Sequence, residues 1–295
     1  MRIAIAGSSG LIGSELVESL RNDGHEVLRL VRRTATAPTE VQWNPATGDI
    51  DLDALAGTEV LINLAGAGVG DHRWSDAYKA EILNSRLTTT KTISRAAVQL
   101  HVKTLINASA IGWYGDTGST SVDESNAAGT GFLPDVVVAW EGAADEARAA
   151  GIRVVHPRTG LVVSPKGGAW ARLIPLFKMG LGGKLGKGSQ YWSFISMRDE
   201  IAAMKFVMTH ESLSGPVNFT SPHPATNAEV TSAMSKAYKR PALFHVPATA
   251  LKIVLGEFSQ EVLGSSRVLP TKLLAAGFTF SDPDVQSAME TLVAK

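Results

Sequence analysis

The sequence contains no cysteine, which excludes disulfide bonds, thiolate metal sites and thiol nucleophiles together. A reducing compartment is therefore permitted, and the side chains offer no redox chemistry of their own. The sequence also lacks an excess of either charge, because 28 Lys and Arg residues balance 28 Asp and Glu residues. Nucleic acid is therefore not expected as a partner, since binding to a phosphate backbone needs a basic excess.

Long hydrophobic runs are missing as well. The apolar runs fall far short of the roughly 20 residues that a bilayer crossing needs, so no membrane partner is expected. Gly7 and Gly10 interrupt the apolar start before the core of a signal peptide could form. The seven histidines lack the spacing of a metal site, so no metal is expected. Together these features predict a cytoplasmic, unprocessed protein.

Short apolar runs alternate with helical periods in the first half of the chain, which is typical of βαβ units around a parallel sheet. The expected strands cover residues 3–6, 27–31, 60–65, 105–109, 154–156 and 217–220. The expected helices cover residues 11–23, 85–100, 139–150, 227–238, 248–255 and 283–293. This order predicts an α/β protein with a doubly wound, Rossmann-type parallel sheet.

The regular alternation weakens after residue 164, where glycine and proline become frequent. We expect a nucleotide-binding Rossmann domain over residues 1–164, with returning segments near 191–220. Residues 165–190 and 221–295 are expected to form a smaller C-terminal lobe that holds the substrate.

Three glycines with three-residue spacing follow the first expected strand. A dinucleotide pyrophosphate rests at such a turn on backbone amides and a helix N-terminus, and glycine permits the close approach. Glycine-rich turns are common between strands and helices, so the place directly after the first strand is what favours a nucleotide site. The residues expected to bind the cofactor here are Gly7, Ser9, Gly10, Leu11, Ile12 and Gly13.

The second expected strand ends in Arg32 and Arg33, with no acid where the adenosine ribose is expected. A carboxylate there would accept the ribose hydroxyls of NAD. An arginine pair instead supplies charge-assisted donors for the 2′-phosphate of NADP. The pair therefore predicts NADP, and a solvated basic turn is the alternative.

Two further strand ends carry candidate residues. The loop that begins at Gly66 either flanks the cofactor or is an ordinary flexible loop. Ser109 and Tyr114 follow the next strand, and ligands bind at the carboxyl ends of parallel strands, so both point to a substrate. Taken singly, each is better explained by an ordinary hydrogen bond than by catalysis. Glu141 is expected to be a surface acid or, if buried, a base.

Several of these motifs occur together in one family. The glycine turn, the turn at 63–66 and the Ala-Ser-Ala-x-x-x-Tyr-Gly stretch at 108–115 resemble the extended short-chain dehydrogenase/reductases, the nucleotide-sugar epimerase and dehydratase group. Residues 73–86 are similar to the Arg-Trp-(x4)-Lys-x-Glu-(x3)-Ser-Arg signature of the atypical branch called epimerase family 39U. The 268–278 stretch matches the C-terminal domain of unknown function of that branch, so the resemblance spans essentially the whole chain.

The resemblance implies an NADP-binding Rossmann domain with a C-terminal substrate lobe, in a branch where most members lack an established reaction. It places seven positions against the cofactor, namely Arg32, Arg33, Leu64, Ala65, Glu81, Arg86 and the loop around Gly160. Extended relatives often pair through two helices, so a monomer and a homodimer both remain open.

One departure from the family concerns the Tyr-x-x-x-Lys pair, in which lysine lowers the pKa of the phenol so that tyrosine can transfer a proton. No tyrosine here is followed by lysine four residues later, and Leu133 and Val137 align with the pair. Tyr114 is then expected to keep the ordinary tyrosine pKa of about 10.

Two functions are compatible with this departure. One is an NADP-dependent oxidoreductase or epimerase-like enzyme for an unknown small molecule, with Ser109 and Tyr114 polarising the substrate. The other is a non-catalytic NADP(H)-binding redox sensor or regulator.

Overall fold

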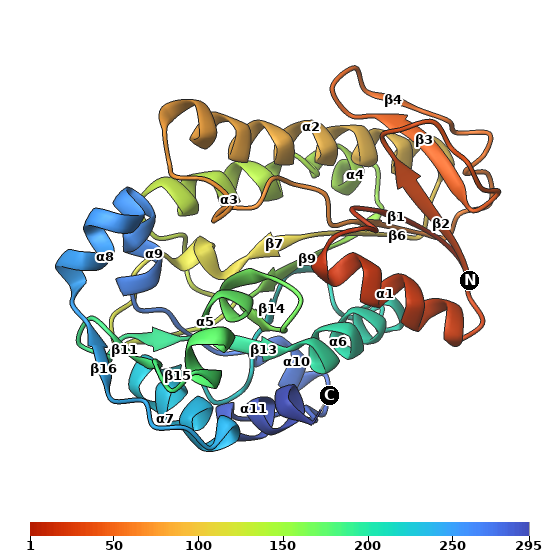
Figure 1. Ribbon diagram of the computed structural model, residues 1–295. Helices are drawn as coiled ribbons and strands as arrows, with labels where there is room; N and C mark the ends of the chain where they lie inside the picture. The colour runs from red at the N-terminus through yellow and green to blue at the C-terminus, as the bar shows by residue number, and fades with distance from the viewer. Residues whose placement is uncertain (295) are drawn as a thin grey trace.

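The computed structural model describes residues 1–294. Its centre is a large sheet with the order β14-β9-β6-β5-β1-β2-β3-β4, and β7 also pairs with β9 (Figure 1). The strands are β1 (Arg2–Ala6), β2 (Glu26–Val31), β3 (Glu40–Asn44), β4 (Asp49–Ile50), β5 (Val60–Asn63), β6 (Thr104–Asn107), β7 (Ser109–Ala110), β9 (Arg153–Thr159) and β14 (Gly215–Phe219). All pairs are parallel except β3 with β4. The predicted doubly wound parallel sheet is confirmed.

The central strands are buried along their whole length because helices cover both faces of the sheet. β5 and β6 are buried at every position, as parallel strands between two helical layers should be. β1 pairs with β2 on one side and with β5 on the other, so the strand order reverses at β1. Ligands bind at such a switch point, beside the carboxyl ends of the strands.

Each face of the sheet has its own helical layer. α1 (Leu11–Asn22) and α6 (Met197–Thr209) pack their apolar side chains against one face. α2 (Asp76–Leu100) and α4 (Asp145–Ala149) cover the other face, and α3 (Phe132–Gly142) lies next to α2 (Figure 1). Among residues 1–294, no helix is both long and apolar enough to cross a membrane.

Two predicted helices differ from the structure by more than two residues. α2 begins at Asp76 rather than at residue 85, because the Ser75 hydroxyl caps it by accepting the N–H of Tyr78. In its first two turns only Tyr78 and Ile82 are buried, so the apolar period is short there. The single helix predicted over 139–150 is wrong, since α3 ends at Gly142 and α4 starts at Asp145.

The C-terminal lobe has a separate core below the sheet in Figure 1. Its longer helices are α5 (Gly168–Lys178), α7 (Asn227–Tyr238), α8 (Ala248–Leu255) and α11 (Val285–Val293), and its shorter ones are η2 (Gly256–Phe258), α9 (Ser259–Leu263) and α10 (Thr271–Ala275). Its strands form four pairs, β10 (Leu161–Val163) with β13 (Phe194–Ser196), β11 (Gly183–Leu185) with β16 (Phe244–Val246), β12 (Tyr191–Trp192) with β15 (Ala225–Thr226), and β17 (Arg267–Val268) with β8 (Ser121–Val122). The short helix η1 (Ile111–Tyr114) directly follows β7.

The two edge strands of the main sheet, β4 and β14, differ in what limits their pairing. At one edge, β4 is only two residues long and runs antiparallel to β3. At the other edge, β14 contains Pro216, and the Asn218 N–H donates to the carboxylate of Glu124 at 2.9 Å. The Asn218 side chain donates in turn to the Leu269 carbonyl at 2.9 Å.

Candidate functional site

The glycine turn after β1 lies at the switch point of the sheet. Gly7 has φ 76°, and a Cβ on it would lie 2.6 Å from the carbonyl carbon of Leu64. A Cβ on Gly13 would lie 2.2 Å from the Gly7 oxygen, whereas one on Gly10 would lie 3.2 Å from that oxygen. Chain packing therefore requires Gly7 and Gly13, while the space beside Gly10 is open apart from this one contact.

The N-terminus of α1 is available to an anion. Gly10 is the N-cap and provides no side-chain cap, and the first turn contains no acidic residue. The first N–H groups of a helix have no partner within the helix, and the helix dipole favours negative charge there. Ser9 is exposed at this turn, and Leu11 and Ile12 are half-buried. The turn fits a dinucleotide pyrophosphate, and contact of these three residues with a cofactor stays a prediction.

The end of β5 places Leu64 and Ala65 against the glycine turn. The Leu64 N–H donates to the Ala6 carbonyl at 2.9 Å. Asn63 Oδ1 accepts the N–H of Ala65 at 3.2 Å, and Asn63 Nδ2 donates to Asn107 Oδ1 at 2.8 Å. The loop that borders the turn is thus held by a bond between two strand ends. Sequence reasoning missed this bond, although the two asparagines at equivalent strand ends were a usable signal.

Arg86 of α2 lies beside the same loop without a carboxylate partner among residues 1–294. Its guanidinium donates to the carbonyls of Ala67 and Ile82, both at 2.9 Å, and lies 4.8 Å from the Trp140 ring centre. A Cβ on Gly66 would lie 3.4 Å from Arg86 Cγ. Burial lowers the pKa of Arg86 to about 10, so the group remains charged at neutral pH. It is a partly desolvated cation beside the predicted cofactor loop.

Two other predicted cofactor residues lie in different surroundings. Glu81 is exposed on α2. Gly160 follows β9, and a Cβ there would lie 2.6 Å from the Ser193 carbonyl oxygen, so packing requires glycine. Contact of either residue with a cofactor stays a prediction.

The arginines at the end of β2 differ in their partners. Arg33 donates to both carboxylate oxygens of Glu40, at 2.6 and 2.8 Å, and Arg29 donates to one of them at 2.6 Å. Hydrogen bonds from Arg33 and from the N–H of Thr36 lower the pKa of Glu40 to about 2. Arg32 is exposed and has no ion pair in the described part of the chain. Sequence reasoning missed Glu40 because it lies on β3, a strand that was not predicted.

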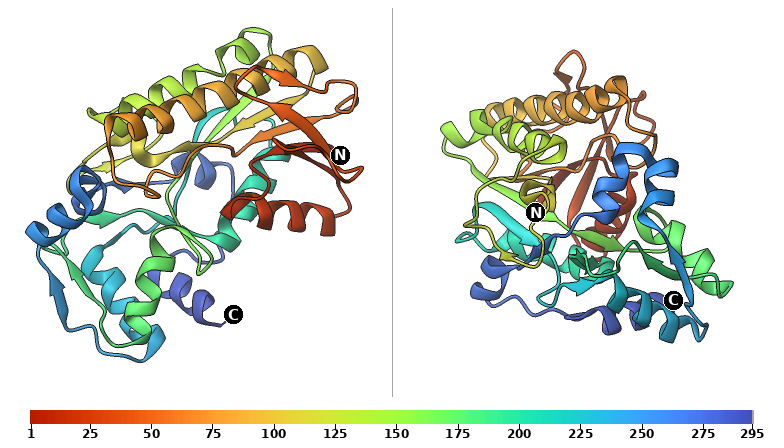
Figure 2. Two further views of the ribbon diagram at one scale, coloured as in Figure 1. Left: turned by 45° about the horizontal axis from the view of Figure 1, so that its top comes forward. Right: turned by 90° about the vertical axis from the view of Figure 1, so that its left-hand side faces the viewer.

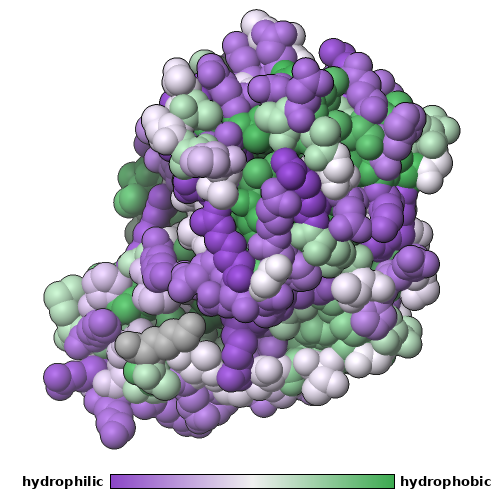
Figure 3. Space-filling view, turned by 90° about the vertical axis from the view of Figure 1, so that its right-hand side faces the viewer, coloured by the Kyte–Doolittle hydropathy of each residue, from purple (hydrophilic) through white to green (hydrophobic). Residues whose placement is uncertain are grey.

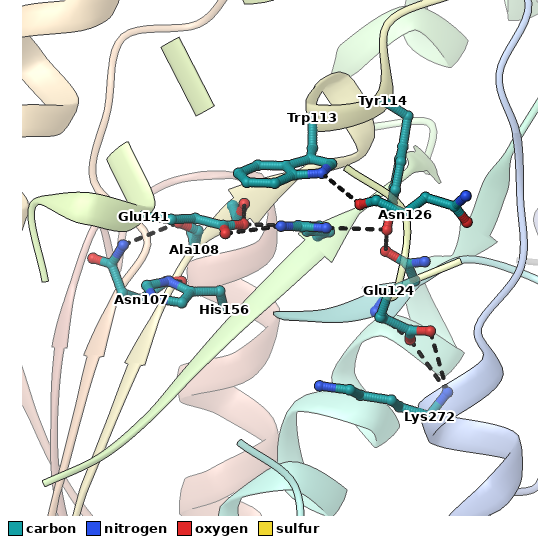
Figure 4. Close-up of polar contacts among 12 residues, drawn as sticks. Asn107, Ala108, Trp113, Tyr114, Glu124, Asn126, Glu141, His156 and Lys272 are labelled. Atoms are coloured by element: carbon teal, nitrogen blue, oxygen red, sulfur yellow. Dashed lines mark hydrogen bonds and ion pairs between the residues drawn. The ribbon is translucent and has the colours of Figure 1, made fainter. Parts of the chain in front are cut away.

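Ser109 and Tyr114 belong to one buried polar network. Figure 4 shows Tyr114 and Glu141 within it. The Ser109 hydroxyl donates to Glu141 at 2.6 Å. The Tyr114 hydroxyl donates to Asn218 Oδ1 at 2.8 Å and accepts from Arg158 at 3.2 Å. Both hydroxyls are therefore occupied by internal partners, and their role toward a substrate stays a prediction.

Arg158 and Glu141 form the centre of this network. Arg158 donates to the two Glu141 oxygens at 2.8 and 2.9 Å, and its guanidinium lies 3.8 Å from the Trp113 ring centre. Arg158 is 2% exposed. The expectation that Glu141 is a surface acid is wrong, and the ion pair leaves it poorly suited to act as a free base. The sequence signal for this ion pair was Arg158, an arginine within a strand that is otherwise mostly buried.

The expected pKa of Tyr114 is also wrong. Burial raises it to about 12, although Arg158 and Asn218 act in the opposite direction. Leu133 and Val137, which align with the missing pair, pack near Gly112 and bring no polar group to it. A phenol with this pKa gives up its proton less readily than an exposed one, so base catalysis by Tyr114 at neutral pH is weaker than the sequence suggested.

The C-terminal lobe covers the glycine turn from one side. Lys166 forms an ion pair with Glu15 of α1, with 2.5 Å between Nζ and Oε1. A Cβ on Gly167 would lie 3.3 Å from Leu11 Cδ1. The loop before α5 therefore lies against the first turn of α1, where the cofactor is predicted to bind.

A second set of contacts joins the lobe to the loop after β5. Arg172 of α5 donates to the Gly70 carbonyl at 2.6 Å, and Lys79 pairs with Glu257 at 2.6 Å. Phe258 packs edge-on against Trp74, with 5.6 Å between ring centres. Figure 2 shows the lobe beneath the carboxyl ends of the strands, with the predicted cofactor turn on the same side. A small molecule held there would contact both parts of the protein.

Glu200 of α6 is a fully buried carboxyl group near the end of β9. Thr159 donates to one of its oxygens at 3.1 Å, and the other oxygen has no hydrogen-bond partner. Burial raises the pKa of Glu200 to about 8, so the group is mostly protonated at neutral pH. Sequence reasoning gave no signal for it.

We expect the Glu200→Gln variant to gain stability over the wild-type protein as pH rises. From about pH 5.5 to pH 7.5 the native carboxyl keeps its proton and the unfolded one, with a pKa near 4.5, has lost it. Wild-type stability then falls by about 1.4 kcal/mol per pH unit from this group, so the difference widens by about 2 to 3 kcal/mol. Urea unfolding of both proteins at pH 5.5 and at pH 7.5 measures this difference in the free energy of unfolding.

Burial lowers the pKa of His156 to about 4. This group therefore makes the protein more stable as pH rises, which is opposite to the effect of Glu200. Its contribution is present in both proteins and cancels in the comparison. If the difference between variant and wild type stays constant with pH, Glu200 is charged in the fold and this reading is wrong.

The sequence pattern of the NAD dependent epimerase/dehydratase family matches residues 3–219. A domain of unknown function, DUF1731, matches residues 246–292.

The chain is similar to named relatives along nearly its whole length. It is 45% identical over 288 residues to an epimerase family protein of Mycobacterium leprae, covering 97% of this chain and 94% of the other. It is 32% identical to the chloroplastic SDR39U1 homolog of Arabidopsis thaliana, covering 99% and 87%. A solved structure of the human epimerase family protein SDR39U1 with NADPH superposes with a TM-score of 0.89 at 26% identity, covering both chains completely.

Proposed function

The chain belongs to the NAD dependent epimerase/dehydratase family, and on that premise we propose that it binds NADP and acts as an oxidoreductase or epimerase-like enzyme on a small molecule. The resemblance to the 39U branch is confirmed, including its C-terminal domain of unknown function. The observation that carries the proposal is the uncapped, acid-free N-terminus of α1 behind the glycine turn, at the switch point of the sheet.

Three groups support NADP as the cofactor. Arg32 is exposed at the end of β2, Arg33 is anchored beside it by Glu40, and no acid takes the ribose position at the end of β2. Arg86 adds a cation next to the loop after β5. The human relative was solved with NADPH, which agrees with this choice. A bound nicotinamide cofactor supplies hydride transfer, and the chain supplies binding, orientation and exclusion of water.

An acidic small molecule is the favoured kind of substrate. Arg172 comes from the lobe and bonds to Gly70, and a Cβ on Gly256 would lie 2.9 Å from Nε of Arg73, which comes from the loop after β5. The ring of Phe258 lies beside Gly70, since a Cβ on Gly70 would lie 3.2 Å from it. These two cations on the facing loop and lobe favour a substrate that carries a carboxylate or a phosphate.

A regulator that binds NADP(H) without turnover is the second candidate function. It is favoured by the buried hydroxyls of Ser109 and Tyr114 and by the pKa of Tyr114 near 12. A positioned proton donor typically contributes about 10² to 10⁴-fold to a rate, and neither hydroxyl is free to act as one here. The enzyme function is therefore tested by NADPH oxidation in a screen of acidic carbonyl compounds, and the regulator function predicts binding without oxidation.

The cofactor choice is tested by replacing Arg32 with alanine. We expect NADPH to bind about tenfold more weakly, because one charge-assisted bond to the 2′-phosphate contributes about 1.5 kcal/mol or more. NADH lacks that phosphate, so its affinity should be unchanged. Fluorescence titration of both cofactors into purified protein measures the ratio.

Arg95→Ala is the matched control, because Arg95 is also exposed but lies on the far half of α2. A wild-type protein that binds NADH and NADPH equally well would contradict the NADP assignment. Equal losses for the two cofactors in the Arg32 variant would show that the arginine does not read the phosphate.

A further inference from the structure

Two segments of the C-terminal lobe carry positive charge and no carboxylates of their own. Residues 168–188 and 230–256 contain no aspartate or glutamate, although the whole chain is electrically neutral. The cations on these segments are Arg172, Lys178, Lys184, Lys187, Lys236, Lys239, Arg240 and Lys252. Within residues 1–294 none of them pairs with a carboxylate. The neutral chain therefore concentrates unpaired positive charge on one part of its surface.

Large apolar side chains protrude on the same segments. Leu243, Ile253 and Val254 are 86%, 75% and 72% exposed, and Phe244 and Met179 are also exposed. α8 consists mainly of alanine, leucine, isoleucine and valine, yet none of its residues is buried. A surface helix normally packs its apolar face on a core, so this helix leaves hydrophobic area uncovered.

The two segments form one surface. β11 pairs with β16, which places Gly183 beside Phe244 and Lys184 beside His245. α8 begins directly after β16, with Pro247 as its N-cap. The right-hand view of Figure 2 shows α8 and β16 along one margin of the lobe. The opposite side of the molecule, in Figure 3, shows hydrophilic and hydrophobic residues intermixed. We call residues 178–187 and 239–255 the basic apolar edge.

We propose that the basic apolar edge docks on the surface of a membrane that contains anionic lipids. Protruding isoleucine, valine and leucine side chains enter the boundary between headgroups and acyl chains, and the flanking lysines attract the headgroups. The uncompensated charge selects an anionic surface, and side chains that protrude without a groove suit a fluid lipid surface better than a shaped protein partner. The sequence argument against a membrane concerned crossing helices, and a surface-bound protein needs none. This proposal is independent of the cofactor and of turnover.

Sedimentation with lipid vesicles tests the proposal on the full-length protein. One set of vesicles is pure phosphatidylcholine, and the other contains about one-third phosphatidylglycerol to supply negative surface potential. We expect binding to the anionic vesicles to exceed binding to the neutral ones at least tenfold and to decrease as salt is added. Equal or absent binding to both kinds of vesicle overturns the proposal.

Two variants separate the contributions of charge and apolar contact. The Lys184→Gln, Lys187→Gln, Lys252→Gln variant should bind anionic vesicles about a hundredfold more weakly, at about fivefold per lysine. The Ile253→Ser, Val254→Ser variant should bind at least tenfold more weakly. The controls are Lys91→Gln, Arg95→Gln on α2 and Val138→Ser on α3, whose side chains are exposed elsewhere and should leave binding unchanged. All variants should keep the wild-type melting temperature and NADPH affinity.

Equal losses in the variants and in their controls overturn the proposal. So does a lipid-free dimer that the Ile253→Ser, Val254→Ser variant abolishes, because the edge would then bind a second copy of the chain. Sedimentation velocity without vesicles makes that measurement.

Discussion

Replacing Glu141 with alanine is expected to lower the free energy of unfolding by about 3 to 5 kcal/mol, because it leaves Arg158 buried without its counter-charge. Arg158 is 2% exposed and makes both of its carboxylate bonds to Glu141. The remaining partners, the Tyr114 hydroxyl and the Trp113 ring, carry no negative charge. Urea unfolding followed by circular dichroism measures the loss.

The double variant Glu141→Leu, Arg158→Met is the matched control. Replacing a buried ion pair by apolar side chains is often nearly neutral, so this variant should recover most of the stability lost by Glu141→Ala. If Glu141→Ala unfolds like the wild-type protein but loses activity on a substrate, Glu141 acts in chemistry rather than in holding Arg158.

Replacing Gly10 with valine is expected to weaken NADPH binding at least a hundredfold while leaving the protein folded. A Cβ at this position meets a single atom, the Gly7 oxygen at 3.2 Å, so the fold can accept a side chain. The branched side chain then occupies the space that a pyrophosphate needs above the first turn of α1. Fluorescence titration gives the affinity, and the melting temperature shows that the variant is folded.

Gly13→Ala gives the contrasting result, because its Cβ would lie 2.2 Å from the Gly7 oxygen. It should destabilise the protein by more than Gly10→Val does, even though it adds fewer atoms. Normal NADPH binding by a folded Gly10→Val protein would mean that the cofactor site lies away from this turn.

The sequence was sufficient for features that depend on neighbouring residues along the chain. The apolar runs predicted the central strands, and the spacing of Gly7, Gly10 and Gly13 placed the turn between β1 and α1. Features that depend on distant residues were missed. Glu40 reaches Arg33 from β3, a short strand whose alternation was too weak to predict. Glu141 reaches Arg158 from another element of the fold, so no local pattern could indicate that this glutamate is buried.

The start of α2 was missed for a different reason. Its first turns are capped by Ser75 and joined to the lobe by Lys79, and their Tyr78 and Ile82 pack in a small separate cluster with Val136 of α3. Hydrophobic periodicity is clearest where a helix packs on a large core, and two buried positions were too few to extend the predicted helix back to Asp76. Glu200 was missed because a buried acid within a helix has the same sequence appearance as an exposed one.

The edges of the main sheet limit how this protein can assemble. An unprotected edge strand can pair with a strand of another copy, which extends the sheet and leads to aggregation. Here β4 is short and contains Asp49, and Pro216 of β14 has no N–H to donate. Glu124 already accepts the N–H of Asn218 on that strand. Both margins are therefore poor templates for strand addition, so copies of this chain that meet in a crowded cell would have to associate through helices or loops instead.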